Sequence, residues 1–146
     1  FLIPTNAGEP PKSLSKIASG GEMSRIMLAI KSILADSDNV GTLIFDEIDI
    51  GISGRAAFKV AQKLRFLSAG KQIICVTHLA QIACMAKSHF LVEKLMTKSA
   101  TETKLKLLNE DERVYELARI TAGAHITETT LKNAREMLEM VKQNNS

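Results

Sequence analysis

Two short apolar segments, each ending in polar residues, constrain the fold of this chain most strongly. Residues 42–45 read TLIF and are followed at once by Asp46 and Glu47, while residues 73–76 read IICV and are followed by a threonine and His78. Such runs are typical of parallel strands that are buried on both faces of a sheet. Because ligands of open α/β sheets bind beyond the carboxyl ends of the strands, these polar residues are candidates for a functional site.

Helices and further strands are expected around these two runs. Apolar residues recur at helical spacing from Met23 to Leu34, and other helices are expected at about 55–67, at 79–86 and as a pair within about 111–142, with Thr127 as N-cap of the last. Two more strands are expected at 90–92 and 103–108, with the polar stretch 97–102 as the hairpin tip. Strands that alternate with helices predict an α/β fold with a mostly parallel sheet flanked by helices.

Length and charge narrow the class of protein. The 146 residues suit one domain with a substantial core, and a net charge of +3 is too small to predict a polyanion partner. No apolar run reaches the roughly 18 residues that span a bilayer, and no signal peptide is recognisable, so no membrane partner is expected. Cys75 and Cys84 lack metal-site spacing, which favours buried free thiols and a reducing cytoplasm over a disulfide or metal site.

The chain begins at Phe1 rather than at Met, which favours a fragment of a longer protein over a processed N-terminus.

The first motif is SGGE at positions 19–22, where the first long helix begins. Ser19 and Glu22 have the spacing of a capping box, in which each side chain accepts the backbone N–H of the other residue. Gly20 and Gly21 lack Cβ atoms, so a phosphate could approach the free N–H groups and the positive end of the helix dipole. The two interpretations, a helix cap and an anion site, are compatible.

The second and third motifs are the polar residues that follow the two strands. An acid at the end of a strand, here Asp46, can hold Mg²⁺ through water, and its neighbour Glu47 can orient or deprotonate an attacking water. His78 is expected near them if the two strands are neighbours, where it could hydrogen-bond a phosphate or position the water. A solvated acidic turn and a histidine in a helix cap are the alternative interpretations.

The order and spacing of these motifs resemble the second half of ABC-type ATPase cassettes. By this resemblance positions 18–22 match the signature motif, although Ala18 stands where leucine is usual, and positions 42–47 match the Walker B strand. The roles that it implies are those of the Walker B aspartate, the catalytic glutamate and the switch histidine, carried by Asp46, Glu47 and His78. The implied fold is the C-terminal lobe of a P-loop ATPase head.

The residues after the acidic pair narrow the resemblance. Positions 46–55 read DEIDIGISGR, which is similar to the RecN family within the SMC group of chromosome-handling ATPases. The stretches THLAQ at 77–81 and ITETTL at 126–131 are similar to the same family. Transporter cassettes usually have proline directly after the acidic pair. Ser53, in the D-loop region at 48–54, falls where many ABC proteins have an aspartate, and the resemblance extends a D-loop role to it.

The Walker A part of an ABC-type head is missing. No G-x₄-GK[ST] sequence occurs, so the phosphates of a nucleotide have no cradle. In SMC-like proteins a long coiled coil separates the Walker A half from the half seen here. The resemblance therefore implies a lobe that is incomplete without the Walker A lobe and that is inactive as an isolated fragment.

The resemblance also implies a mechanism for the complete protein. Two heads enclose two ATP molecules, and one head faces the γ-phosphate held by the other through its signature residues, which are Ser19, Gly20, Gly21 and Glu22. Asp46 helps to hold Mg²⁺, Glu47 polarises water and His78 senses the γ-phosphate. Head closure and hydrolysis drive DNA handling in double-strand-break repair and recombination, in the cytoplasm and at the nucleoid. The implied partners are the Walker A half of the same parent chain, a second head and DNA.

Two other classes of protein remain open from the sequence. One is a fragment of an ABC transporter nucleotide-binding domain, and the other is a non-catalytic α/β interaction module. A separate candidate for phosphate contact is a group of lysines around the expected hairpin, for which a solvated face is the alternative: Lys94, Lys98, Lys104 and Lys106.

Overall fold

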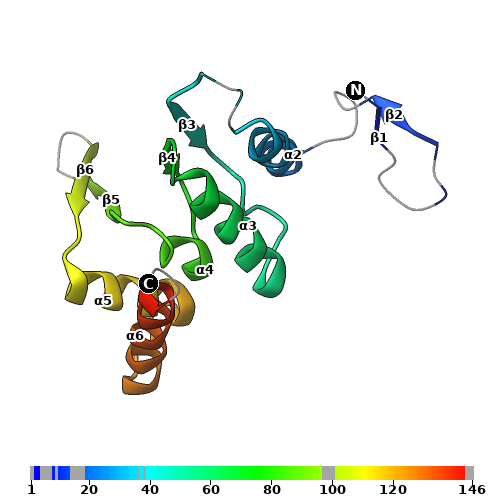
Figure 1. Cartoon of the computed structure of the whole chain (residues 1–146). Coiled ribbons are helices and arrows are strands. Elements are labelled where there is room, and N and C mark those ends of the chain that lie inside the picture. The colour runs from blue at the N-terminus through cyan, green and yellow to red at the C-terminus, as the bar shows by residue number, and fades with distance from the viewer. Residues whose placement is uncertain are drawn as a thin grey trace. The chain divides into compact units, whose positions relative to one another are not determined.

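The computed structural model describes residues 2–3, 8, 10–13, 19–35, 37, 39–96 and 101–143. The chain divides into two compact units, Phe1–Thr77 and His78–Ser146, whose elements are labelled in Figure 1. The first unit contains β1 (Leu2–Ile3), β2 (Lys12–Ser13), α2 (Gly20–Ile33), β3 (Thr42–Phe45), α3 (Gly54–Leu67) and β4 (Gln72–Cys75). The second contains α4 (Ala80–Ala83), β5 (Phe90–Met96), β6 (Thr101–Leu107), α5 (Glu110–Ala122) and α6 (Glu128–Gln143).

The strand pairs are both parallel and antiparallel. β3 and β4 pair in parallel, with Phe45 opposite Cys75, so the two strands that were expected to be neighbours are neighbours. β1 pairs with β2, and β5 with β6, in antiparallel register. The described sheets are therefore more mixed than the alternation of strands and helices predicts. The physical reason in the β5–β6 case is that a short connection can join only antiparallel neighbours, whereas a parallel pair needs a long crossover such as α3.

The β3–β4 pair is buried on one face only. Leu43 and Phe45 are buried, but Ile44 is 69% exposed, Ile74 45% and Val76 58%. The expectation of strands buried on both faces is therefore wrong for this chain taken by itself. A continuous apolar run predicts cover on two sides, and the described residues cover only the side of Leu43 and Phe45.

Two helices of the first unit pack on each other and carry one buried stripe each. α2 buries Gly21 and Leu28, and α2 contacts α3. The buried stripe of α3 has the spacing of a single helical face and consists of Ala57, Ala61, Leu64 and Leu67. The buried residues of β3, Leu43 and Phe45, belong with this stripe to the buried apolar residues of the unit.

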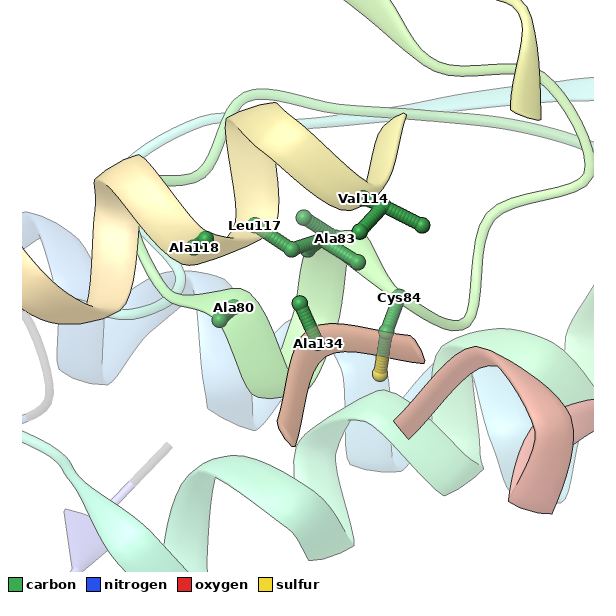
Figure 2. Close-up of a cluster of buried hydrophobic side chains, with 7 residues drawn as sticks. All are labelled: Ala80, Ala83, Cys84, Val114, Leu117, Ala118 and Ala134. Atoms are coloured by element: carbon green, nitrogen blue, oxygen red, sulfur yellow. The ribbon is translucent and has the colours of Figure 1, made fainter. Parts of the chain in front are cut away.

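The core of the second unit is built by α4, α5 and α6. Figure 2 shows its seven buried side chains in one cluster to which the segments of all three helices contribute: Ala80, Ala83, Cys84, Val114, Leu117, Ala118 and Ala134. Leu117 and Ala118 have no exposed surface. The helical spacing of the apolar residues in α5 predicts this face correctly.

The ends of two helices in this unit differ in how well the sequence predicts them. α4 stops at Ala83, earlier than the predicted end, because the N–H groups of Met85 and Ala86 donate to carbonyls three residues back, which tightens the last turn. The Thr127 cap of α6 is confirmed, since the Thr127 hydroxyl accepts the N–H of Thr130 at 3.2 Å.

The β5–β6 hairpin extends further than predicted. Its ladder runs from Phe90 opposite Leu107 to Met96 opposite Thr101. Thr101 and Glu102 therefore belong to β6 rather than to the predicted tip, and the rest of that tip, 97–100, lies outside the described residues. Both strands continue beyond the segments that look like strands in isolation, because each added residue pairs with one on the neighbouring strand.

The hairpin lysines lie on two faces. Lys104 is opposite Glu93 in the ladder, and Lys94 is opposite Thr103, one position along and therefore on the other face. Lys106 shares the face of Lys104 and forms an ion pair with Glu112. Lys98 lies outside the described residues. The three described lysines therefore do not form one common phosphate-binding surface.

Two expectations from the sequence concern the state of the cysteines and the length of the apolar segments. Both cysteines are free, Cys84 buried and Cys75 half-buried. In the part of the chain that the structure describes, no helix is long and apolar enough to cross a membrane.

Candidate functional site

The SGGE motif forms the N-terminus of α2 as a capping box. The Ser19 hydroxyl accepts the N–H of Glu22 at 3.3 Å, and the Glu22 carboxylate accepts the Ser19 N–H at 2.9 Å. The hydrogen bond from the Ser19 backbone lowers the pKa of Glu22. Glu22 is therefore held as a charged cap at the positive end of the helix dipole. Ala18, the first position of the predicted signature motif, lies outside the described residues.

The paired glycines let the turn after β3 approach this helix end. A methyl group on Gly20 would overlap the Glu47 carboxylate, and one on Gly21 would stand 2.7 Å from the Glu47 carbonyl oxygen and 3.1 Å from that of Ile50. Gly21 is therefore required by the local packing, independently of any ligand, whereas a methyl group at Gly20 would displace only the end of the Glu47 side chain. The structure thus brings three predicted site residues together: Gly20, Gly21 and Glu47.

Glu47 has a strained backbone. Its φ is 58°, and among the described residues it is the only one with positive φ that is not glycine. The left-handed conformation costs a residue with a Cβ atom roughly 1–2 kcal/mol. The surrounding turn fixes it, because the Glu47 N–H donates to Asp46 Oδ1 at 2.9 Å and the Glu47 carbonyl accepts the Ile50 N–H at 3.1 Å. Strain of this kind at a carboxylate is characteristic of functional positions.

Asp46 is exposed and held by its neighbour. Only Oδ1 of its carboxylate takes part in the hydrogen bond with Glu47, and the residue lies at the carboxyl end of β3. The carboxylate is therefore oriented without being covered, which suits a role in holding Mg²⁺ through water. No group of three or more metal-ligating side chains is arranged for a metal ion within the described ranges.

Two residues of α2 that the sequence did not single out tie the helix to the same turn. The Ser24 hydroxyl donates to the Asp46 carbonyl at 2.9 Å, and the Arg25 guanidinium donates to the carbonyls of Ile48 (3.1 Å) and Ile50 (2.8 Å). Arg25 follows Gly21 by one helical turn and therefore shares its face. That spacing was the signal in the sequence that could have identified it.

A buried hydrogen bond connects the turn to β4. Asp49 is 3% exposed, and its Oδ2 accepts the Thr77 hydroxyl at 2.6 Å. Burial, with the negative charges of Asp49 and Asp46, raises the pKa of the Cys75 thiol to about 12. The predicted site thus lies beside a half-buried neutral thiol and a buried carboxylate, and neither was predicted to belong to it.

The remaining predicted site residues lie at the ends of elements. Ser53 is the N-cap of α3, with no side-chain capping bond, and its carbonyl accepts the N–H of Ala56 at 3.1 Å. His78 is the first residue of the second unit and directly follows Thr77 in the chain. A D-loop function for Ser53 and a sensing function for His78 stay predictions.

The fold is similar to that of a solved SMC ATPase. That structure, from work described as "Structural biochemistry of ATP-driven dimerization and DNA stimulated activation of SMC ATPases", aligns with a TM-score of 0.53 and covers 82% of this chain and 79% of its own. The identity is 18%, so the likeness establishes the fold alone. The fold of the chain is thus the mixed α/β fold of that SMC ATPase structure, which agrees with the predicted fold class. No family model matches the chain.

The sequence is also similar to curated proteins of one kind, the DNA repair protein RecN. DNA repair protein RecN of Bacillus subtilis (strain 168) is 48% identical over 143 residues, which are 98% of this chain and 25% of that protein. RecN of Haemophilus influenzae is 50% identical over 141 residues (97% and 25%), and RecN of Treponema pallidum 51% over 138 (94% and 24%). The resemblance to RecN is confirmed over nearly the whole chain, which spans about a quarter of the length of these relatives.

Proposed function

We propose that this chain is the C-terminal part of an ATP-hydrolysing, SMC-like protein that acts in DNA double-strand-break repair and recombination. The observation that carries the proposal is the packing of Gly20 and Gly21 against the strained Glu47. This packing sets an anion-binding helix end beside a carboxylate at the end of a parallel strand. The RecN similarity supports the DNA-repair context, in the cytoplasm and at the nucleoid.

Within this function the two acidic residues have different roles: Asp46 helps to hold the metal and Glu47 activates water. ATP would supply the phosphoryl group, and bound Mg²⁺ would neutralise the charge on its oxygens. The exposed carboxylate of Asp46 would help to hold the metal through water. Glu47 orients and deprotonates the attacking water, and His78 hydrogen-bonds the terminal phosphate. Ser24 ties the Asp46 backbone to α2 and Arg25 ties the Ile48 backbone to it, so the turn is held on both sides of Glu47 and the carboxylates need little reorganisation during the reaction.

The signature residues act on a second head. Ser19 and Gly21, with Gly20 and Glu22 beside them, form a helix end that contacts the γ-phosphate bound by the opposite head. Ser53 contributes from the D-loop region. Hydrolysis is therefore coupled to pairing of two heads, and DNA is the partner of the complete protein. The Walker A half of the parent chain supplies the phosphate cradle that this sequence lacks.

Reconstitution tests the proposal. Mg²⁺-dependent ATP hydrolysis is measured with this chain alone, with the Walker A half alone and with the two mixed. We expect hydrolysis only in the mixture, and its loss when the mixture contains Glu47→Gln. Hydrolysis by this chain alone would contradict the division of the site between two halves. Hydrolysis by the mixture that persists in Glu47→Gln would remove Glu47 from the mechanism.

The two alternatives are not favoured. The hypothesis of a transporter cassette is disfavoured because residues 46–55 are similar to RecN and because the curated relatives are RecN proteins. A non-catalytic module has no need of a carboxylate in a strained conformation. The strain at Glu47 thus supports the enzymatic alternative.

A further inference from the structure

Asp49 is a buried carboxylate whose chemistry is not accounted for by the roles above. It is 3% exposed and lies two positions after Glu47. Burial of an ionised carboxylate is unfavourable unless hydrogen bonds compensate for the lost water. Its bond with the Thr77 hydroxyl is 2.6 Å long. This length is typical of a charge-assisted O–H···O⁻ bond, which is stronger than a neutral one.

The bond joins the ends of two neighbouring strands. Asp49 belongs to the turn after β3, where the Ile50 N–H donates to the Glu47 carbonyl and the Ile52 N–H donates to the Asp49 carbonyl at 3.4 Å. Thr77 follows β4 and immediately precedes His78. The β3–β4 ladder continues to this end, because the Val76 N–H donates to the Phe45 carbonyl at 2.9 Å. The Asp49–Thr77 bond is a side-chain link that extends this connection beyond the strands.

We infer that Asp49 and Thr77 are positioning residues: their bond fixes the end of β4, from which the chain continues directly into His78, to the turn carrying Glu47. Threonine suits this task because its branched Cβ restricts χ1, so the hydroxyl and the backbone move together. The inference rests on the proposed function and adds to it. Neither residue contacts nucleotide in this role, so their removal lowers the rate of hydrolysis and leaves ATP affinity unchanged.

The first test uses steady-state ATP hydrolysis by the full-length protein. Thr77→Val keeps the shape and removes the hydroxyl, whereas Thr77→Ser keeps the hydroxyl and serves as the matched control. We expect kcat to fall by about 10- to 100-fold in Thr77→Val, the usual effect of losing a hydrogen bond to a charged group, with KM for ATP within about twofold of wild type. Thr77→Ser stays within about threefold in kcat. Unchanged kcat in Thr77→Val, or an equal fall in Thr77→Ser, overturns the inference.

The second test asks whether the effect passes through His78. Once His78→Ala has removed the imidazole, adding Thr77→Val is expected to lower kcat no further. A further fall of the size seen in the His78-containing protein would show that the bond has a general structural role, and the inference would be wrong. If Thr77→Val does not fold, Asp49→Asn replaces it, since the amide oxygen still accepts the hydroxyl through a weaker neutral bond. A several-fold fall in kcat that disappears with His78→Ala is expected there, and unchanged kcat overturns the inference.

Failure of the inference and failure of the proposed function give different results. If Glu47→Gln and His78→Ala both leave hydrolysis intact, the proposed function is wrong whatever Thr77 does. If both lower the rate of hydrolysis while Thr77→Val retains the rate of wild type, only the positioning role is wrong.

Discussion

Gly21 lies so close to the carbonyl oxygen of Glu47 that a Cβ atom at this position would stand 2.7 Å from it. The contact joins the first turn of α2 to the turn after β3, and Arg25 reinforces it by donating to the Ile50 carbonyl. A motif that reads as a ligand-binding sequence is therefore also a packing element. The two glycines differ in what they meet: Gly21 meets backbone, and Gly20 meets the end of a side chain.

This difference predicts that alanine lowers stability at Gly21 but lowers ATP turnover at Gly20. Gly21→Ala forces backbone apart, and overpacking of this kind costs about 1–3 kcal/mol in the free energy of unfolding. Gly20→Ala displaces only the Glu47 carboxylate, so the fold is kept and ATP turnover falls. Because both substitutions give the same gain in helix propensity, the comparison isolates the contact. Urea unfolding and hydrolysis are measured for both, and equal stability of the two variants would contradict this packing.

Glu47→Gln in the full-length protein is expected to slow ATP turnover by roughly 10²- to 10⁴-fold, the usual contribution of general base catalysis. ATP binding is retained, because Asp46 keeps its charge. Single-turnover hydrolysis and equilibrium binding of a labelled nucleotide separate the two effects. The matched control is Glu22→Gln, which keeps an oxygen that can accept the Ser19 N–H and is expected to lower turnover far less.

Ser19→Arg is expected to permit nucleotide binding but to prevent pairing of two heads. The arginine side chain would occupy the helix end that contacts the second nucleotide. Size-exclusion chromatography with multi-angle light scattering, with and without ATP in a Glu47→Gln background, measures pairing. Ser19→Ala is the comparison: it removes the hydroxyl, and with it a cap worth about 0.5–2 kcal/mol, but adds no bulk at the helix end, so it is expected to weaken pairing less than Ser19→Arg does. ATP-dependent pairing by Ser19→Arg would exclude the signature assignment.

Cys75 is expected to react slowly with thiol reagents, because burial raises its pKa from 9.0 to about 12. A Cys84→Ser variant leaves Cys75 as the one thiol of the chain. At pH 8.5 its alkylation in the folded state is expected to be about 10²- to 10³-fold slower than in urea, since the thiolate is the reactive form. Equal rates in the two states would show an ordinary thiol.

The same shift in the pKa of Cys75 predicts that the free energy of unfolding falls as the pH rises above 9.0. The folded state keeps the Cys75 proton more tightly, so the unfolded state loses its proton first as the pH rises above 9.0. The contribution of Cys75 to stability is therefore lost progressively between pH 9 and 12. Urea unfolding at pH 8 and 10 measures it, and Cys75→Ser is expected to show a smaller loss between the two.

Leu117→Ala is expected to cost about 2–5 kcal/mol in the free energy of unfolding, because the side chain is completely buried between the helices of the second unit. Leu107→Ala is the matched control: it removes the same atoms from a side chain that is 58% exposed and is expected to cost much less. Urea unfolding of this chain compares them. Equal losses would contradict the helix cluster shown in Figure 2.

Several elements could be predicted from local sequence because local interactions decide them. The capping boxes of α2 and α5 rest on residues three positions apart, and the face of α5 that contains Leu117 follows from helical spacing. The lengths of α4 and of the β5–β6 ladder could not be predicted. They depend on which backbone partners are available once the chain has folded, and no short window of sequence contains that information.

The sequence by itself determined the α/β class, the SGGE and Asp46–Glu47 motifs and the similarity to RecN, since each depends on residue type and spacing along the chain. Only the tertiary structure decided that Glu47 adopts a left-handed conformation, that Gly20 and Gly21 pack against it, and that Asp49 accepts the Thr77 hydroxyl. These contacts join residues far apart in the chain, and the Asp49–Thr77 bond forms because the parallel pairing of β3 and β4 brings the carboxyl ends of both strands to one edge.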